Sequence, residues 1–204
     1  MNMTDVAAAT IRDLHWPLLP DANPTVAAML HDPYLAHIVA VELTGNGQEQ
    51  PVRHWIDGTG LHVRNPATVQ PVPALWGEAL PPDPIEHVIE LAPQGRYQVS
   101  LDVVPEQSEP HHRSQGRGRG RRRYIAAPAE QAVWLTDRFT TAGCTDITVR
   151  RLEQRLASST HTVHDIRSVH AVLDVTVTDP EAAAALEVGR RRSYGYGTPR
   201  WAHA

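Results

Sequence analysis

The strongest constraint on the fold is the order in which strand-like and helix-like stretches follow one another along the 204 residues. In the first half, a strand at 9–16 precedes a helix that begins at Asp32-Pro33, because aspartate caps free helix amides and proline suits the first turn. Two short strands, 52–56 and 61–64, then flank Asp57-Gly58, a dipeptide typical of a tight hairpin. The stretch from Pro66 to Pro84 is rich in proline and predicts little regular structure.

The second half begins with the clearest strand, 95–104, whose apolar residues alternate with polar ones. The almost apolar-free stretch 105–120 predicts a loop, and the pattern then favours a strand at 121–125, a helix at 128–139, strands at 147–156 and 163–177, and a helix at 180–188. Both halves fit a βαββαβ unit. We therefore predict an α+β fold of two tandem ferredoxin-like (RRM-like) domains, spanning 1–92 and 93–204.

Composition narrows the class of protein. No apolar run approaches the roughly 18 residues that a membrane helix needs, and the first ten residues lack the basic and apolar parts of a secretory signal. The single cysteine, Cys144, excludes an internal disulfide network and a multi-cysteine zinc site. We expect a cytoplasmic protein with no membrane partner.

The charge is distributed unevenly. All nineteen basic side chains are arginine; residues 1–110 carry a formal charge of −10 and residues 111–204 carry +6. Arginine binds phosphate through two parallel hydrogen bonds and stacks on bases, whereas a GC-rich genome would also replace lysine without any functional reason. The asymmetry between the halves is harder to attribute to genome composition and indicates a polyanion on the second half.

Three arginine-rich segments are the candidate nucleic-acid contacts. The first is 189–197, whose glycines would let backbone amides approach a phosphate, and the second is the arginine–glycine run 116–123. The third is the strand 147–156, where alternation places Arg151 and Arg155 on one face and Arg150 on the other. The alternatives are a solvated turn, a solvated loop and a strand edge protected by charge. The candidate RNA-binding residues are Arg117, Arg119, Arg121, Arg150, Arg151, Arg155, Gly189, Arg190, Arg191, Arg192, Gly195 and Gly197.

Tyr34 and His37 are the candidate catalytic residues. They stand three apart at the start of the predicted helix, so that phenol and imidazole share one face. Histidine accepts or donates a proton near neutral pH, although the same spacing also suits an ordinary half-buried pair. The chain has twelve histidines, yet none stands with an acidic or cysteine partner at a recognised metal-ligand spacing. We therefore predict no metal and no cofactor, with a metal-dependent hydrolase kept as the alternative, and we expect Cys144 to be inert.

Four segments, in the same order, resemble the CasE family, the CRISPR repeat-processing endoribonucleases of type I-E Cascade complexes. The resemblance is carried by Asp32-Pro-Tyr-Leu-Ala-His37, by Leu91–Val99, by Pro128–Leu135, and by Val175–Glu181 followed by Val188-Gly189 and Gly195-Tyr-Gly197. The arginines at 190–192 and the sequence after Thr198 depart from the family's pattern.

The resemblance implies a metal-independent cut at the 3′ base of the repeat hairpin, in which the RNA's own 2′-hydroxyl attacks and leaves a 2′,3′-cyclic phosphate. By the same resemblance, His37 is the acid or base, Tyr34 orients or activates the hydroxyl, and Arg192 contacts the phosphate. The implied partners are the CRISPR repeat RNA hairpin (crRNA), which the enzyme retains, and the other Cascade subunits; outside the complex the protein is expected to be a monomer. The alternative is a non-catalytic RNA-binding module or scaffold subunit with the same fold.

Overall fold

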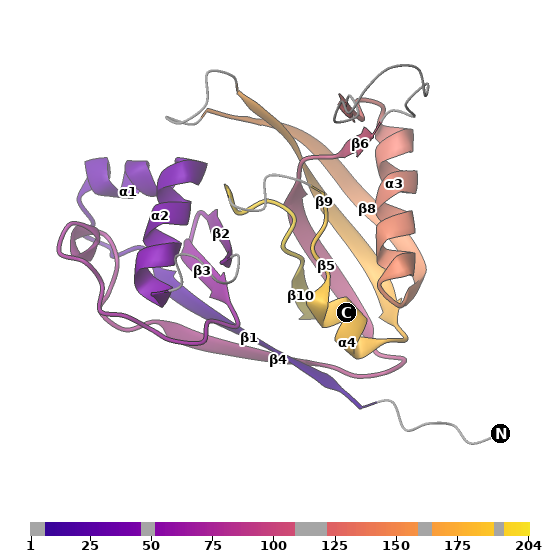
Figure 1. Ribbon diagram of the computed structural model, residues 1–204, viewed down its shortest axis with the longest axis horizontal. Helices are drawn as coiled ribbons and strands as arrows, with labels where there is room; N and C mark the ends of the chain where they lie inside the picture. The colour runs from indigo at the N-terminus through magenta and orange to yellow at the C-terminus, as the bar shows by residue number, and fades with distance from the viewer. Residues whose placement is uncertain (1–6, 46–51, 109–121, 159–164, 190–193) are drawn as a thin grey trace, which may run out of the picture.

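Two four-stranded antiparallel sheets, each with helices on one face, make up the computed structural model (Figure 1). The structure describes residues 7–45, 52–108, 122–158, 165–189 and 194–204. The predicted α+β fold with two ferredoxin-like sheets is confirmed.

The first sheet has the strand order β2-β3-β1-β4. Its strands are β1 (Ala9–Pro17), β2 (Arg53–Asp57), β3 (Gly60–Arg64) and β4 (Ile85–Leu91). Two helices, α1 (Pro24–Leu30) and α2 (Pro33–Thr44), follow β1 and pack on one face, where Leu14, Trp16, Val39, Leu43 and Leu61 form much of the core. A short 3-10 turn, η1 (Trp76–Glu78), occupies the place in the chain where a βαββαβ unit has its second helix.

The second sheet repeats this topology with the order β10-β5-β9-β8. Its strands are β5 (Arg96–Val103), β8 (Cys144–Ala157), β9 (Ile166–Val177) and β10 (Arg200–His203), and its helices are α3 (Pro128–Thr141) and α4 (Pro180–Ala185). A separate two-stranded hairpin, β6 (Glu106–Ser108) with β7 (Arg122–Tyr124), precedes α3. Leu101, Leu135, Phe139 and Leu173 are fully or almost fully buried in the core of this half.

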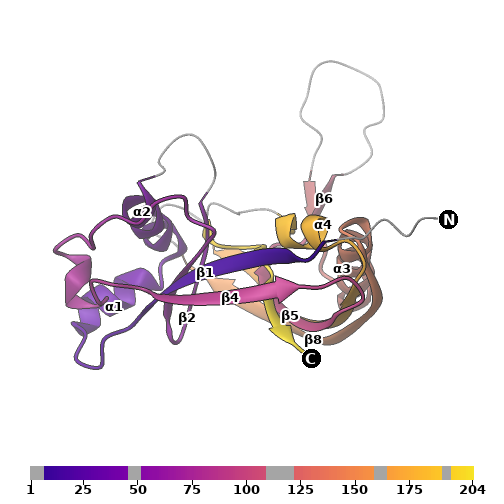
Figure 2. The ribbon, with the colours of Figure 1, turned by 90° about the horizontal axis from the view of Figure 1, so that it is seen from below.

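The two halves share buried residues. β1 and β4 run side by side as long ribbons beneath both halves (Figure 2). Ile11 of β1 and Leu91 of β4 are each 0% exposed and belong to the core of the second sheet. The first sheet therefore inserts one end into the second core, which fixes the two halves against each other.

The predicted elements are found, together with five that the sequence did not predict. No secondary structure was predicted for α1, β4 or β10, η1 lies in the proline-rich stretch 66–84 for which little regular structure was predicted, and β6 lies within the predicted loop 105–120. A further correction concerns β8, where a bulge after Val149 interrupts the alternation. The guanidinium of Arg150 pairs with Asp174 at 2.6 Å, on the same sheet face as Arg151, whereas simple alternation predicted opposite faces.

Candidate active site

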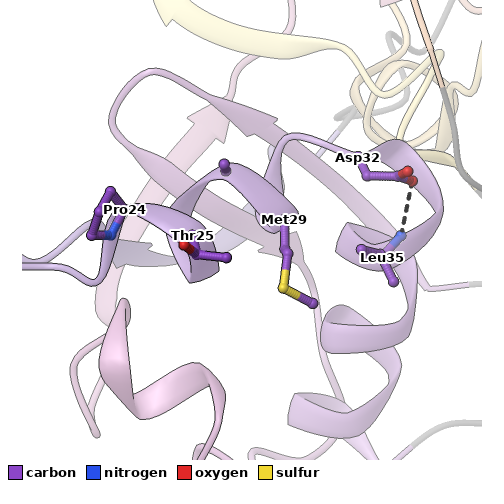
Figure 3. Close-up of a pocket in the computed structure, with 6 residues that line it drawn as sticks. Pro24, Thr25, Met29, Asp32 and Leu35 are labelled. Carbon is purple, nitrogen blue, oxygen red and sulfur yellow. Dashed lines mark hydrogen bonds between the residues drawn. The ribbon is translucent and has the colours of Figure 1, made fainter.

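The start of α2 presents Tyr34 and His37. Asp32 caps this helix: its Oδ1 accepts the backbone N–H of Tyr34 at 2.8 Å and of Leu35 at 3.3 Å (Figure 3). Pro33 occupies the first turn, where its missing N–H is no loss. Leu35 faces a small, mostly apolar pocket between α1 and α2, and neither Tyr34 nor His37 lines that pocket. The cap therefore fixes the first turn, from which the phenol and the imidazole project.

Tyr34 and His37 are half-buried, and each ring lies against a ring from another element. The Tyr34 ring is 6.3 Å from that of Tyr194, centroid to centroid, and the His37 ring is 5.3 Å from that of His54. Tyr194 comes from the segment between α4 and β10, and His54 from β2. The predicted pair thus lies where helix α2, strand β2 and a segment of the second half meet.

His54 is a buried imidazole directly beside His37. It is 1% exposed, and its Nδ1 lies 3.3 Å from the carbonyl oxygen of Val52. Burial lowers the pKa of His54 to about 4, and burial also lowers the pKa of His37 below the ordinary histidine value. Both rings are therefore neutral at pH 7.

Residues 186–189 and 194–199, the described parts of the segment between α4 and β10, are together called the glycine loop, and Gly195 in it lies against His54. Gly195 has φ +81, and a Cβ there would lie 3.1 Å from the carbonyl oxygen of His54 and 3.3 Å from its Nε2. Gly197 has φ +87, and a Cβ there would collide with the carbonyl oxygen of Val188. These glycines permit the left-handed backbone and the close approach of the loop to protein atoms.

The glycine loop is anchored on both sides. On the second half, the N–H of Gly197 donates to the carbonyl oxygen of Asp102 at 2.7 Å, and the N–H of Val188 donates to that of Gly197 at 2.8 Å. On the first half, the guanidinium of Arg64 donates to the carbonyl oxygen of Pro199 at 2.5 Å and binds both carboxylate oxygens of Asp13. The loop therefore holds Tyr194 and Gly195 against the rings of the first half.

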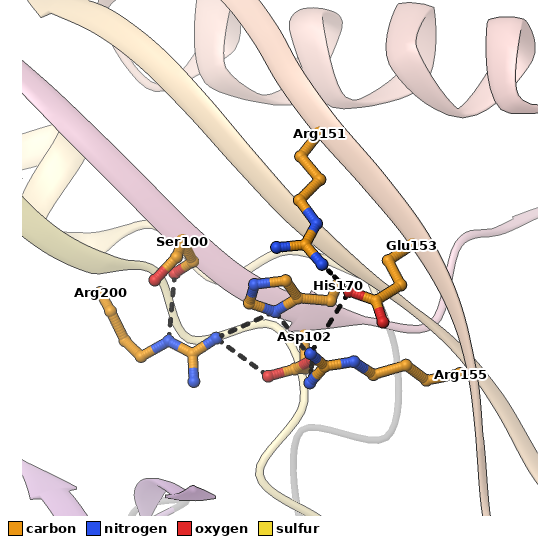
Figure 4. Close-up of polar contacts among 7 residues, drawn as sticks. All are labelled: Ser100, Asp102, Arg151, Glu153, Arg155, His170 and Arg200. Atoms are coloured by element: carbon orange, nitrogen blue, oxygen red, sulfur yellow. Dashed lines mark hydrogen bonds and ion pairs between the residues drawn. The ribbon is translucent and has the colours of Figure 1, made fainter.

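Two of the three arginines of β8, Arg151 and Arg155, lie in a network of charges on the open face of the second sheet (Figure 4), and Arg150 pairs with Asp174. Arg151 and Arg155 both reach Glu153, at 2.7 and 3.7 Å, and Arg155 also binds Asp102 at 3.0 Å. His170 and Arg200 bind the same Asp102 at 3.1 and 2.9 Å. The side chains of Arg150, Arg151 and Arg155 remain 45–62% exposed. The structure thus places these three guanidinium groups on one solvent-accessible face of the second sheet.

The other predicted site residues divide into two groups. Gly189 lies in the described part of the glycine loop, packed against Val103 and Val104 at the end of β5. Arg117, Arg119, Arg121, Arg190, Arg191 and Arg192 lie outside the described residues.

Sequence reasoning missed His54 as a site residue. It sits in an alternating strand, 52–56, and belongs to no motif that marks a functional histidine. The only available signal was that His54 lies on the hairpin that follows the Tyr34–His37 helix. That signal is insufficient, because the fold topology determines which residues of the hairpin face the helix. Tyr194 lies in the predicted RNA-binding segment 189–197, but no local pattern pairs it with Tyr34.

Three further findings concern metal binding, membrane-spanning helices and the single cysteine. Within the described ranges, no group of three or more His, Cys, Asp and Glu side chains is arranged to hold a metal ion. None of the helices in those ranges combines the length and apolarity needed to cross a membrane. Cys144 is buried, and burial raises the pKa of its thiol to about 12, which explains its expected inertness.

Solved structures share this fold at low sequence identity. CRISPR endoribonuclease Cse3 bound to 19-nucleotide RNA matches with a TM-score of 0.71 and 17% identity over 96% of this chain and 100% of that one. Cse3 of Thermus thermophilus, bound to an RNA representing a pre-cleavage complex, matches with a TM-score of 0.66 and 18% identity over 95% and 100%. Cas6e from Escherichia coli K-12 matches with a TM-score of 0.56 and 16% identity over 96% and 100%. No protein-family profile and no curated protein sequence matches the chain.

Proposed function

We propose that this protein is a CRISPR repeat-processing endoribonuclease. It cuts precursor RNA at the 3′ base of the repeat hairpin without a metal ion and keeps the mature crRNA as a Cascade subunit. Two findings support the proposal: the full-length fold match to CRISPR endoribonucleases solved with RNA, and the match to a chain in a CRISPR RNA-guided surveillance complex, at a TM-score of 0.59. The single observation that carries it is the meeting of Tyr34, His37 and the glycine loop at the start of α2.

The reaction is a transesterification within the RNA. The 2′-oxygen bonds to the adjacent phosphorus, the bond from phosphorus to the 5′-oxygen breaks, and the products are a 2′,3′-cyclic phosphate and a 5′-hydroxyl. One group must take the 2′-hydroxyl proton and one must supply a proton to the 5′-oxygen. The lowered pKa of His37 keeps its imidazole neutral at pH 7, which suits the base. The phenol of Tyr34, one turn earlier on α2, orients the attacking hydroxyl or protonates the leaving oxygen.

Arginine supplies the charge that the RNA backbone requires. The ion pairs of Arg150, Arg151 and Arg155 are exposed, and exposed pairs contribute only about 0–1 kcal/mol each. A phosphate can therefore replace Asp174 or Glu153 at little cost. In the proposal, this face and the predicted arginines at 117–121 and 190–192 hold the hairpin, and Arg192 contacts the scissile phosphate. The glycines predicted to approach a phosphate, Gly189, Gly195 and Gly197, pack instead against protein atoms.

The test uses repeat RNA from the organism's own CRISPR array, incubated with the protein in EDTA. We expect one cut that leaves a cyclic phosphate. His37→Ala should lower the single-turnover rate by on the order of 10²–10⁴-fold, because proton transfer is lost. Binding of an RNA with a 2′-deoxy scissile nucleotide should stay within about threefold, since His37 contributes little to the ground-state complex.

His31→Ala is the matched control, because His31 is an exposed histidine at the end of α1 and belongs to no part of the site. It should cut at the wild-type rate. Bound but uncut RNA would favour the non-catalytic RNA-binding module, and a cut that EDTA abolishes would favour a metal-dependent hydrolase. Equal rates for His37→Ala and wild type would remove His37 from the mechanism.

A further inference from the structure

Two neighbouring imidazole rings each hold a buried nitrogen that has no hydrogen-bond partner among the described residues. Nε2 of His54 and Nδ1 of His37 are both buried, and neither finds a partner among the residues that the structure describes. A buried polar atom left unpaired destabilises the folded state by about 1–3 kcal/mol, so such atoms call for a physical explanation. Here the two belong to rings whose centroids are 5.3 Å apart.

The hydrogen bond at the other side of His54 determines where its proton lies. Nδ1 of His54 is 3.3 Å from the carbonyl oxygen of Val52, and a carbonyl oxygen can only accept. Nδ1 therefore carries the hydrogen. Because His54 is fully buried and its pKa is lowered to about 4, the ring is neutral and its Nε2 holds a free lone pair.

A lone pair on Nε2 of His54 requires a donor, and Nδ1 of His37 is the unpaired nitrogen of the adjacent ring. We propose that His54 is a positioning residue for His37: its Nε2 accepts the Nδ1–H of His37, directly or through one ordered water. A neutral His37 with its hydrogen on Nδ1 has a lone pair on Nε2. This Nε2 is not among the buried nitrogens that lack a partner. His54 thus selects the tautomer in which His37 can take the 2′-hydroxyl proton, an inference that rests on the proposed function.

The surroundings of His54 exclude a direct role in the reaction. It is 1% exposed, and Gly195 of the glycine loop lies against its Nε2 edge, where a Cβ would be 3.3 Å away. No RNA atom can reach it there. An apolar ring would fill the same space without an unpaired nitrogen, so packing alone gives no reason for a histidine.

Two substitutions separate positioning from packing. His54→Gln keeps an oxygen that can accept the Nδ1–H of His37, whereas His54→Phe keeps the ring and removes both nitrogens. We expect His54→Phe to lower the single-turnover cleavage rate by roughly 10–100-fold while the affinity for uncut 2′-deoxy RNA stays within about twofold, because outer-shell partners act on orientation. His54→Gln should recover the rate to within about fivefold of wild type. Wild-type cleavage by His54→Phe, or a parallel loss in both variants, overturns the proposal.

A second measurement needs neither RNA nor a variant. Nitrogen-correlated imidazole NMR spectra of the wild-type protein at pH 7 report which nitrogen of each neutral ring is protonated. We expect the hydrogen on Nδ1 in both His37 and His54. A His37 hydrogen on Nε2 would contradict the proposal even if His54→Phe fails to fold. Since this measurement does not depend on cleavage, it tests the role of His54 even if the protein does not cut RNA.

Discussion

At the scale of single residues, burial rather than charge pairing determines the chemistry of the histidines. His54 has no charged partner, and its low pKa comes from desolvation, with the nearby His37 adding to it. Burial likewise lowers the pKa of His15, His37 and His170, although Asp102 acts in the opposite direction on His170. Each of these groups binds its proton more weakly in the folded chain than in the unfolded one. Protonation therefore favours unfolding.

This linkage predicts that lowering the pH destabilises the fold already at pH values above those at which carboxylates titrate. A histidine whose pKa falls from 6.5 to about 4 on folding contributes full stability above pH 6.5 and loses it as the pH falls toward 4. For His54 this amounts to about 2 kcal/mol between pH 7 and pH 5. Urea denaturation at both pH values should show this loss in wild type and a smaller loss in His54→Gln, the remainder coming from the other three histidines. An identical pH dependence in the two proteins would contradict the burial of His54.

At the scale of elements, the helices and strands that could be predicted are those with uninterrupted alternation or with recognisable capping residues at their ends. Strand β5 alternates along its whole length, and α2 has a capping aspartate, a first-turn proline and a C-terminal Gly45 with φ 64. Strand β4 is mostly exposed on both faces, so it has no alternation to read, and β10 has only four residues, whose pairing with β5 spans about 100 positions. The Tyr34–His37 pair was found because both residues lie on one helix. The contact with His54 arises from tertiary packing, and no local pattern encodes it.

The glycine loop offers a prediction at this scale. In Gly197→Ala the new Cβ meets the carbonyl oxygen of Val188, and the residue keeps a left-handed backbone, so we expect a loss of about 2 kcal/mol or more in the free energy of unfolding. Gly58→Ala is the control, because Gly58 has open space around its Cβ position, and its change should stay within about 0.5 kcal/mol. Urea titration measures both. Cleavage should also fall in Gly197→Ala, since this residue anchors the segment that covers His54.

At the scale of the whole molecule, two polar links, one of them buried, hold the two halves in register. Arg64, whose side chain is 1% exposed, joins Asp13 of β1 to the glycine loop. Arg53 of β2 binds Glu187 at 2.8 Å and donates to the carbonyl oxygens at the end of α4, where a helix dipole favours a cation. Together with Ile11 and Leu91 in the second core, these links make independent motion of the halves costly.

Removing one link should therefore destabilise the entire chain. Arg64→Met leaves Asp13 and the carbonyl oxygen of Pro199 without their buried partner, and we expect a loss of about 3–5 kcal/mol in a single unfolding transition. Adding Asp13→Leu should restore much of it, because the stranded charge is gone. Arg12→Met is the control: its pair with Glu86 is exposed, and the change should be about 0–1 kcal/mol. Equal losses for Arg64→Met and Arg12→Met would refute the structural role of Arg64.

Because the candidate site combines residues from both halves, the order of synthesis determines when the site can form. Tyr194 leaves the ribosome 160 residues after Tyr34, so a growing chain exposes its phenol and imidazole long before the covering segment exists. His54 then lacks the lid that Gly195 forms, and the site is unassembled. The proposed ribonuclease activity therefore requires that Gly195 has been synthesised and has packed against His54.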